Sequence, residues 1–361
     1  MQDARIIVLA TPVFLLLIAV EFWVGLKRGR NTYRLSDVLS SIGLGIMSQL
    51  TGVFATAITI GIYTFAYSHV ALWELPTNEV WVWIVGLVFY DLCYYWHHRL
   101  GHTCALFWAA HVVHHQSEDY NLSTALRQTS SGWLGGWLFY LPMAVLGFPP
   151  LVFAVVALID LLYQYWVHTQ QIGKLGWFDR WFCAPSNHRV HHAVNDCYLD
   201  RNFGGIFIVW DRLFGSFQPE LDAEPCVYGT RKPLRSWNPL WANLEVYADL
   251  LRTSWRAARW SDKLRVWFKP PGWQPEDVAQ RFPKPQFDIR QVRRFAPPAS
   301  RRALWAAATL FALLLVATLM FLWVAHTWPL TQQLAALAAI VGGLWIVGAL
   351  CETRTAASAN R

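Results

Sequence analysis

The stretch ALWAAATLFALLLVATLMFLWVA (303–325) carries no charged side chain. A helix needs about 20 predominantly apolar residues to cross the hydrocarbon core of a bilayer, so this stretch predicts a transmembrane helix. IIVLATPVFLLLIAVEFWVGL (6–26) is a second run of that length, and only Glu21 interrupts it. The second run lacks a small-residue cleavage site, which favours a retained membrane anchor over a removed signal peptide.

The rest of the chain is also rich in apolar residues. The 361 residues are 55% hydrophobic and 15% charged, whereas soluble domains carry roughly 25% charged residues. The runs at 80–96 and 334–351 are shorter spans, and the run at 36–67 exceeds one span and predicts a helix tilted or broken near Thr51 and Gly52. We therefore predict an all-α integral membrane protein built as a multi-span helical bundle.

The apolar segment 132–167 predicts a hairpin of two helices. Gly147, Phe148, Pro149 and Pro150 interrupt it, and the residue before a proline is pushed out of the helical region. With this hairpin the chain would cross the membrane about seven times, with the C-terminus inside.

The net charge of +7 is unevenly distributed. Basic residues follow the first run and precede the run at 303–325, whereas the intervening short loops carry no Lys or Arg. The positive-inside bias predicts that the basic loops are cytoplasmic. Because they border spans and alternate with Trp and Leu, these residues favour anionic lipid headgroups over nucleic acid as a partner.

The pattern divides the chain into four regions. We expect N-terminal transmembrane helices at 1–78, a catalytic domain at 79–220, a cytoplasmic basic or interfacial segment at 221–300, and a C-terminal transmembrane hairpin at 301–361. Within the third region, Leu, Trp and Tyr mix with Arg and Lys at near-helical spacing, which predicts either a helix lying in the membrane interface or an ordinary amphipathic helix. The six cysteines form no C-x-x-C pair and predict neither a disulfide nor a cysteine metal site.

Nine of the 12 histidines form a pattern of closely spaced groups. HRLGH, HVVHH and HRVHH place histidines three or four residues apart, which puts them on one face of a helix. Each H-x-x-H-H is expected to aim its histidines at a single point. Eight or nine imidazoles suit two metals with four or five ligands each, more than one tetrahedral site can use. The predicted ligands are His98, His102, His111, His114, His115, His168, His188, His191 and His192.

Ligand type alone does not name the metal, since imidazole suits zinc, copper, iron and nickel. The chain has no Glu-x-x-His, which argues against a carboxylate-bridged di-iron bundle, and no H-E-x-x-H of zinc proteases. Two non-catalytic alternatives stay open at this point: a membrane protein that binds or transports metal, and a structural zinc site.

The histidine region resembles the fatty acid hydroxylase/sterol desaturase superfamily of membrane di-iron enzymes. The resemblance is carried by DLCYYWHHRLGH, WAAHVVHH, NHRVHH and WDRLFGSF, and it covers roughly residues 80–220. HHQSEDYNLSTALRQ is similar to the alkylglycerol monooxygenase branch, although Thr103 and Asn187 depart from that branch's pattern.

The resemblance implies a di-iron site, O2 as co-substrate, a lipid substrate, and a tetrahydropterin or an external electron donor. Asp91, His97, Gln164 and Asn187 are expected to support the ligands, with Asp91 bonded to a ligand imidazole and Gln164 touching the site through its amide. Residues expected to hold a headgroup or the pterin are Glu118, Asp119, Asn121, Arg127 and Gln128.

The predicted function is a membrane-bound oxygenase that hydroxylates a lipid C–H bond, such as the ether carbon of an alkylglycerol. Desaturation on the same site is the alternative, because rebound and second hydrogen abstraction differ only in substrate placement. The expected location is a bacterial inner membrane, or the endoplasmic reticulum, with the histidines on the cytoplasmic side.

Overall fold

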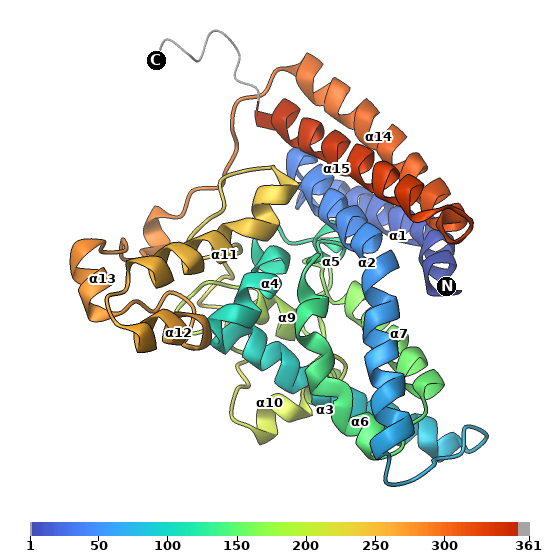
Figure 1. Cartoon of the computed structure of the whole chain (residues 1–361). Helices are drawn as coiled ribbons and strands as arrows, with labels where there is room; N and C mark the ends of the chain where they lie inside the picture. Colours follow the sequence, from blue (N-terminus) through green and yellow to red (C-terminus); the bar gives the residue numbers. More distant parts are fainter. Residues whose placement is uncertain (1, 353–361) are drawn as a thin grey trace.

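A computed structural model describes residues 2–352, and within them the chain forms helices and no β-strand (Figure 1). The prediction of an all-helical membrane protein is confirmed. The helices longer than ten residues are α1 (Gln2–Lys27), α2 (Leu35–Val70), α3 (Val80–Thr103), α4 (Ala105–His115), α7 (Pro150–Trp166), α11 (Pro239–Arg256), α14 (Arg301–Val324) and α15 (Leu330–Glu352). The shorter ones are α5 (Leu122–Ala125), α6 (Leu141–Val145), α8 (Phe178–Trp181), α9 (Pro185–His191), α10 (Val209–Leu213), α12 (Trp260–Phe268), α13 (Glu276–Arg281) and the 3₁₀ turns η1 (Gly132–Leu134), η2 (Gly136–Tyr140), η3 (Ile289–Gln291) and η4 (Ala325–Thr327).

Four of the described helical segments are long and apolar enough to cross a membrane. They are Ile6–Lys27, Leu35–Val70, Arg301–Thr327 and Leu330–Glu352. The expected hairpin of two apolar helices in 132–167 is present as Gly136–Val145, formed by η2 and α6, and Pro150–Trp166, which is α7, but both are shorter than the four segments above. The count of about seven crossings therefore stays a prediction.

The long helix α2 runs through its middle without a break, so the alternative of a broken helix at Thr51 is wrong. The helix continues past Gly52. The Thr51 hydroxyl donates to the carbonyls of Met47 (3.1 Å) and Ser48 (2.9 Å) in the preceding turn, so this hydroxyl needs no partner outside α2. Such back-bonding bends helices without ending them.

The turn between α6 and α7 needs its glycine. Gly147 has φ +83°, a conformation that side chains with a Cβ disfavour. A Cβ there would also lie 1.8 Å from the Trp73 carbonyl oxygen. Pro150 then starts α7, where the missing N–H of proline costs nothing.

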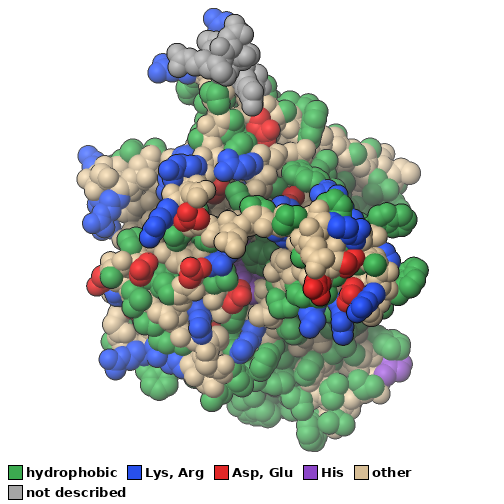
Figure 2. Space-filling view, turned by 90° about the vertical axis from the view of Figure 1, so that its left-hand side faces the viewer, with side chains coloured by type: hydrophobic (Ala, Val, Ile, Leu, Met, Phe, Trp, Pro, Cys, Tyr) green, Lys and Arg blue, Asp and Glu red, His purple; other side chains and the backbone are tan. Residues whose placement is uncertain are grey.

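Two apolar clusters hold the bundle together. One joins α2, α14 and α15 through Ile42, Phe311 and Leu344, and the other joins α3, α6 and α7. The helices α8 to α13 cover one side of the bundle, and Figure 2 shows that side as a face of mixed Lys, Arg, Asp and Glu above a broad hydrophobic area. A hollow opens in this charged face, with histidine visible inside it.

Candidate metal centre

The nine predicted histidines meet as two buried groups. The first contains His98 and His102 of α3, His111 and His115 of α4, and His191 of α9; the second contains His114, His168, His188 and His192. Within each group the candidate ligand nitrogens lie within 4.8 Å of one another. All nine side chains are buried or nearly so.

Each H-x-x-H-H motif divides its histidines between the two groups. In α4, His111 and His115 are four residues apart and join the first group, whereas His114 joins the second. In α9 and its C-terminal end, His188 and His192 join the second group and His191 the first. The expectation that each motif aims at one point is wrong, because adjacent residues of a helix differ by about 100° in direction.

Nitrogens of successive histidines nearly touch. In the first group, the Nε2 atom of His111 lies 3.0 Å from that of His98 and 3.1 Å from that of His115. In the second group, the Nε2–Nε2 distances are 3.0 Å for His114–His168, 3.0 Å for His168–His188 and 3.2 Å for His188–His192.

Backbone carbonyls set the tautomer of several rings. A carbonyl only accepts, so an Nδ1 atom beside one must donate, which leaves the Nε2 lone pair facing the group. The pairs are His98 with Phe203 (2.8 Å), His114 with Arg127 (2.8 Å), His168 with Gln164 (2.8 Å) and His191 with Arg201 (3.0 Å). Clustered lone pairs repel unless a cation lies among them. The Nε2 atoms of His102 and His191 are also buried without a hydrogen-bond partner.

The spacing is short enough for the nitrogens of each group to share one metal ion. With metal–nitrogen bonds of about 2.1 Å, two ligand nitrogens lie roughly 3.0 to 3.4 Å apart. The observed distances are 3.0 to 3.2 Å. The residues present therefore fit a pair of metal ions, one in each group.

Burial favours the neutral, metal-binding form of His114, His188 and His192. It lowers the pKa of His114 to about 4 and lowers the pKa values of His188 and His192, from an ordinary value of about 6.5. For His188 and His192, neighbouring imidazoles lower the pKa further.

These shifts predict acid sensitivity of the metal-free protein. As the pH falls below about 6.5, these histidines bind protons in the unfolded chain but stay neutral in the folded protein. The free energy of unfolding therefore falls by up to about 1.4 kcal/mol per pH unit for each such histidine until about pH 4. We expect the melting temperature of chelator-treated protein, followed by tryptophan fluorescence, to drop by several degrees between pH 7.5 and 5.5. A melting temperature that rises or stays constant would contradict buried neutral histidines.

Two carboxylates hold the loop that orients the first group. Asp211 accepts hydrogen bonds from the backbone N–H groups of Phe203 (2.7 Å) and Gly204 (2.8 Å). Asp91 accepts from the N–H groups of Ile206 (2.6 Å) and Phe207 (3.0 Å). This loop supplies the Phe203 carbonyl to His98, so Asp91 acts on the ligands through the backbone. The predicted direct bond from Asp91 to an imidazole is wrong.

Replacing Asp211 should weaken metal binding at the first group. In Asp211→Asn, an NH2 group would face one of the two N–H donors, and loss of such supporting contacts lowers metal affinity by about 10- to 100-fold. We expect one of the two metals to be lost on dialysis, measured by elemental analysis. Asp222→Asn is the control, because the Asp222 side chain is 94% exposed; equal metal loss in both variants would contradict a role for this loop.

The other supporting residues lie beside the ligands in ways that the sequence did not show. The Gln164 amide bonds to Tyr94 (2.7 Å) and Asp160 (2.6 Å), so only its backbone carbonyl reaches His168. His97 belongs to neither group and packs against Phe139. Asn187 accepts from the Ala184 N–H (3.1 Å) at the start of α9.

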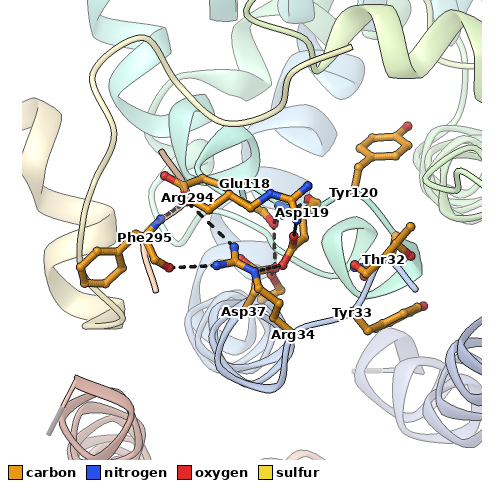
Figure 3. A network of polar contacts seen from close by, with 12 residues as sticks. Thr32, Tyr33, Arg34, Asp37, Glu118, Asp119, Tyr120, Arg294 and Phe295 are labelled. Carbon is orange, nitrogen blue, oxygen red and sulfur yellow. Dashed lines mark hydrogen bonds and ion pairs between the residues drawn. The ribbon is translucent and has the colours of Figure 1, made fainter. Parts of the chain in front are cut away.

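Most of the proposed headgroup residues are structural. Asp119 is buried and binds Arg34 (2.5 Å) and Arg294 (3.3 Å), and Glu118 accepts from the Phe295 N–H (Figure 3). These contacts fasten the connector before α14 to the segment after α4. Both side chains thus already have partners within the fold, and the assignment of Glu118 and Asp119 to a headgroup or pterin stays a prediction.

The next two candidates, Arg127 and Asn121, also have partners within the fold. Arg127 is 1% exposed, and its guanidinium donates to the Val113 carbonyl (2.7 Å) and to Gln116 (3.2 Å). Asn121 caps α5 and donates to the Thr32 carbonyl (2.7 Å). Arg127 instead orients His114 through its own carbonyl.

A cavity of about 310 Å³ leads away from the histidines. His97, His111, His114 and His168 line one end, together with Gln128, so Gln128 alone of the five candidates faces this space. Apolar side chains of α1, α2, α7 and α14 line the other end, including Ile7, Phe14, Leu15, Ile42, Ile46, Leu161, Leu315, Leu319 and Leu322. The cavity therefore joins the candidate metal centre to the interior of the membrane bundle.

Sequence reasoning missed two buried polar residues, Asp160 and Asn202. Asp160 lies beside Asp91 at Gly205, where a Cβ would lie within 2.8 Å of a carboxyl oxygen of each. Asn202, with φ +58°, bonds the Asn187 carbonyl (3.0 Å). Interruption of an apolar run was the only signal for Asp160, and the left-handed preference of Asn the only one for Asn202.

Comparison with known proteins agrees with this geometry. Residues 83–216 match the family model described as fatty acid hydroxylase, and this range contains all nine histidines. The histidine region belongs to the fatty acid hydroxylase family. No solved structure matches the chain.

Several curated proteins that this chain resembles are named as lipid enzymes. The alkylglycerol monooxygenase of Homo sapiens is 39% identical over 74% of this chain and 59% of its own length. The alkylglycerol monooxygenase of Caenorhabditis elegans is 30% identical over 84% of this chain and 64% of its own length. The ornithine lipid hydroxylase OlsE of Rhizobium tropici is 27% identical over 47% of this chain and 53% of its own length. The chain thus spans about three fifths of the alkylglycerol monooxygenases that it matches.

Proposed function

We propose that this protein is a membrane-bound di-iron monooxygenase that uses O2 to hydroxylate a C–H bond of a lipid. The ether carbon of an alkylglycerol is the substrate position that we favour, because two relatives at 39% identity are named alkylglycerol monooxygenases. The observation that carries the proposal is the cavity, which places histidines at one end and side chains of membrane-spanning helices at the other.

The two histidine groups would hold the iron pair. Bound iron would supply the oxidising power that an unactivated C–H bond requires, which no side-chain acid or base provides. The first group offers five nitrogens and the second four, and the shared helices α4 and α9 keep the two sets adjacent. The carbonyl contacts hold each ring in the tautomer that binds metal.

The cavity would orient the lipid. Leu315, Leu319 and Leu322 repeat along α14 at helical spacing and would contact the alkyl chain. Gln128, at the histidine end, would offer the glycerol part a polar contact beside the bond that its amide nitrogen donates to the Ala125 carbonyl (3.1 Å). An apolar chain drawn from the bilayer excludes water from the reacting carbon, and the hollow in the charged face (Figure 2) is a separate route for a reductant.

The proposed reaction balances with an added reductant. One oxygen atom of O2 enters the C–H bond, and the other leaves as water after taking two electrons and two protons from a reduced pterin or another external donor. On an ether carbon the product is a hemiacetal, which breaks its second C–O bond to give a fatty aldehyde and glycerol. We place the donor and the histidines on the cytoplasmic side of the membrane, because the basic loops favour that orientation.

Product analysis tests the proposal. Protein in membranes would receive an alkylglycerol, ferrous iron, a reduced pterin and ¹⁸O2, and any aldehyde would be reduced at once to limit oxygen exchange with water. We expect ¹⁸O-labelled fatty alcohol from wild type and none without reductant. An alkene without label would indicate desaturation, and no oxidised lipid with any ether, acyl or sterol substrate would overturn the oxygenase assignment.

A further inference from the structure

The hairpin of α11 and α12 exposes apolar side chains that the fold does not use. Trp255 and Trp260 are 86% and 81% exposed, the highest values among the large hydrophobic residues that the structure describes. Leu244, Leu251 and Leu264 are each more than half exposed. Comparably exposed Trp305 and Leu9 lie in candidate membrane spans, where lipid covers them.

These side chains form one stripe on α11. Leu244, Leu251 and Trp255 are seven and four residues apart, which places them on a single helical face. The opposite face, with Ala242, Leu250 and Thr253, is buried. Leu250 packs with residues of α4 and α12, so the core is already complete without the exposed stripe.

A lysine joins the stripe to α12. The Lys263 ammonium lies 6.0 Å from the ring centre of Trp255 and 5.7 Å from that of Trp260. It also donates to the carbonyl of Trp255 (2.9 Å) at the end of α11. The two helix faces therefore form one continuous apolar surface, which we name the α11–α12 patch: Leu244, Leu251, Trp255, Trp260, Leu264 and Phe268.

Positive charge surrounds the α11–α12 patch. Residues 239–269 contain six basic side chains, namely Arg252, Arg256, Arg259, Lys263, Arg265 and Lys269, and three acidic ones, namely Glu245, Asp249 and Asp262. Lys232 pairs with Glu245 (2.6 Å) and Lys284 with Asp249 (3.4 Å), both from outside this segment. The basic side chains are therefore left in excess at the rim.

The start of α11 lies where the membrane helices end. Ser236 donates to Glu352 (2.9 Å) in the last turn of α15, and the adjacent antiparallel helix α14 begins at that end with Arg301 and Arg302. The α11–α12 hairpin extends sideways from this point (Figure 1). Trp beside basic residues is typical of the headgroup layer, where apolar rings enter and cations stay in contact with phosphate.

We propose that the α11–α12 patch lies in the headgroup layer of an anionic membrane and forms a second attachment beside the spans. An interfacial helix binds through buried apolar area and through attraction to anionic lipid, and this surface offers both. The attachment is independent of the reaction at the histidines, so it stands or falls without any lipid oxidation.

Photo-crosslinking tests this attachment. Full-length protein carrying Trp255→p-benzoylphenylalanine or Leu264→p-benzoylphenylalanine would be reconstituted in vesicles of phosphatidylcholine, with or without phosphatidylglycerol, and irradiated. The control is the same replacement at Asp222, whose side chain is 94% exposed on a polar loop. Mass spectrometry would then count lipid adducts on the peptides around each position.

We expect lipid adducts at positions 255 and 264 at several times the yield at 222, with a further increase when phosphatidylglycerol is present. Yields at both positions equal to the control would overturn the proposal. Covalent dimers in place of lipid adducts would also overturn it and would assign the patch to a second copy of the chain. A yield of lipid adducts that does not change when phosphatidylglycerol is added would overturn the claim that the patch prefers an anionic membrane.

Discussion

His188→Ala and His115→Ala are each expected to lower lipid oxidation by at least about 100-fold, since even the partners of metal ligands contribute 10- to 100-fold. His188 lies in the second group and His115 in the first, and their nitrogens lie 3.2 Å and 3.1 Å from those of His192 and His111. Each replacement leaves one metal position short of a ligand and the other intact. Elemental analysis should therefore find close to half the wild-type iron in either variant, together with loss of product.

The matched control for both variants is His69→Ala. His69 is exposed and contacts only α2, so its replacement should leave iron content and turnover unchanged. All three variants should insert into membranes as wild type does, because none alters a candidate span's apolar surface. Wild-type turnover in His188→Ala or His115→Ala would refute the two-metal interpretation.

Leu319→Trp is expected to reduce kcat/KM for long-chain lipids by about 10-fold or more. Leu319 lines the apolar end of the cavity, and the added ring would occupy space that the alkyl chain needs; filling a pocket by even a methylene or two changes discrimination by about 1–3 kcal/mol. Iron content should not change, and short-chain substrates should lose less activity than long-chain ones. The measurement is product formation over a series of alkyl chain lengths.

Leu313→Trp provides the control on the same helix. Leu313 is 64% exposed and does not line the cavity, so its replacement adds the same bulk toward lipid. Equal loss of activity in both variants, or a loss in Leu319→Trp that does not depend on chain length, would show that the substrate chain does not use this cavity.

Local sequence patterns were sufficient to predict the features that depend only on neighbouring residues. Apolar length predicts a membrane span because the bilayer core sets it, so α1, α14 and α15 were placed correctly from their composition alone. The segment 132–145 forms 3₁₀ turns and one short α-helix in place of a long helix, because its Gly-rich composition matches an apolar helix in hydropathy but not in helix propensity.

Candidate polar residues were the least predictable. Glu118, Asp119, Asn121 and Arg127 follow the ligand helix α4 and look like binding residues in a linear sequence, yet their partners come from residues 32–34, 113–116 and 294–295. Whether a charged side chain binds a ligand or its own fold depends on which distant segment lies beside it, and one sequence without its fold does not show that.

The sequence by itself determined the helical membrane class and the nine histidines, because hydropathy and helical spacing act within a few residues. Only the tertiary structure decided how those histidines divide. Each H-x-x-H-H contributes to two groups because α3, α4, α9 and His168, just beyond the end of α7, converge from different directions. The carbonyls that orient the rings come from residues up to 105 positions away, and packing of the whole bundle brings them there.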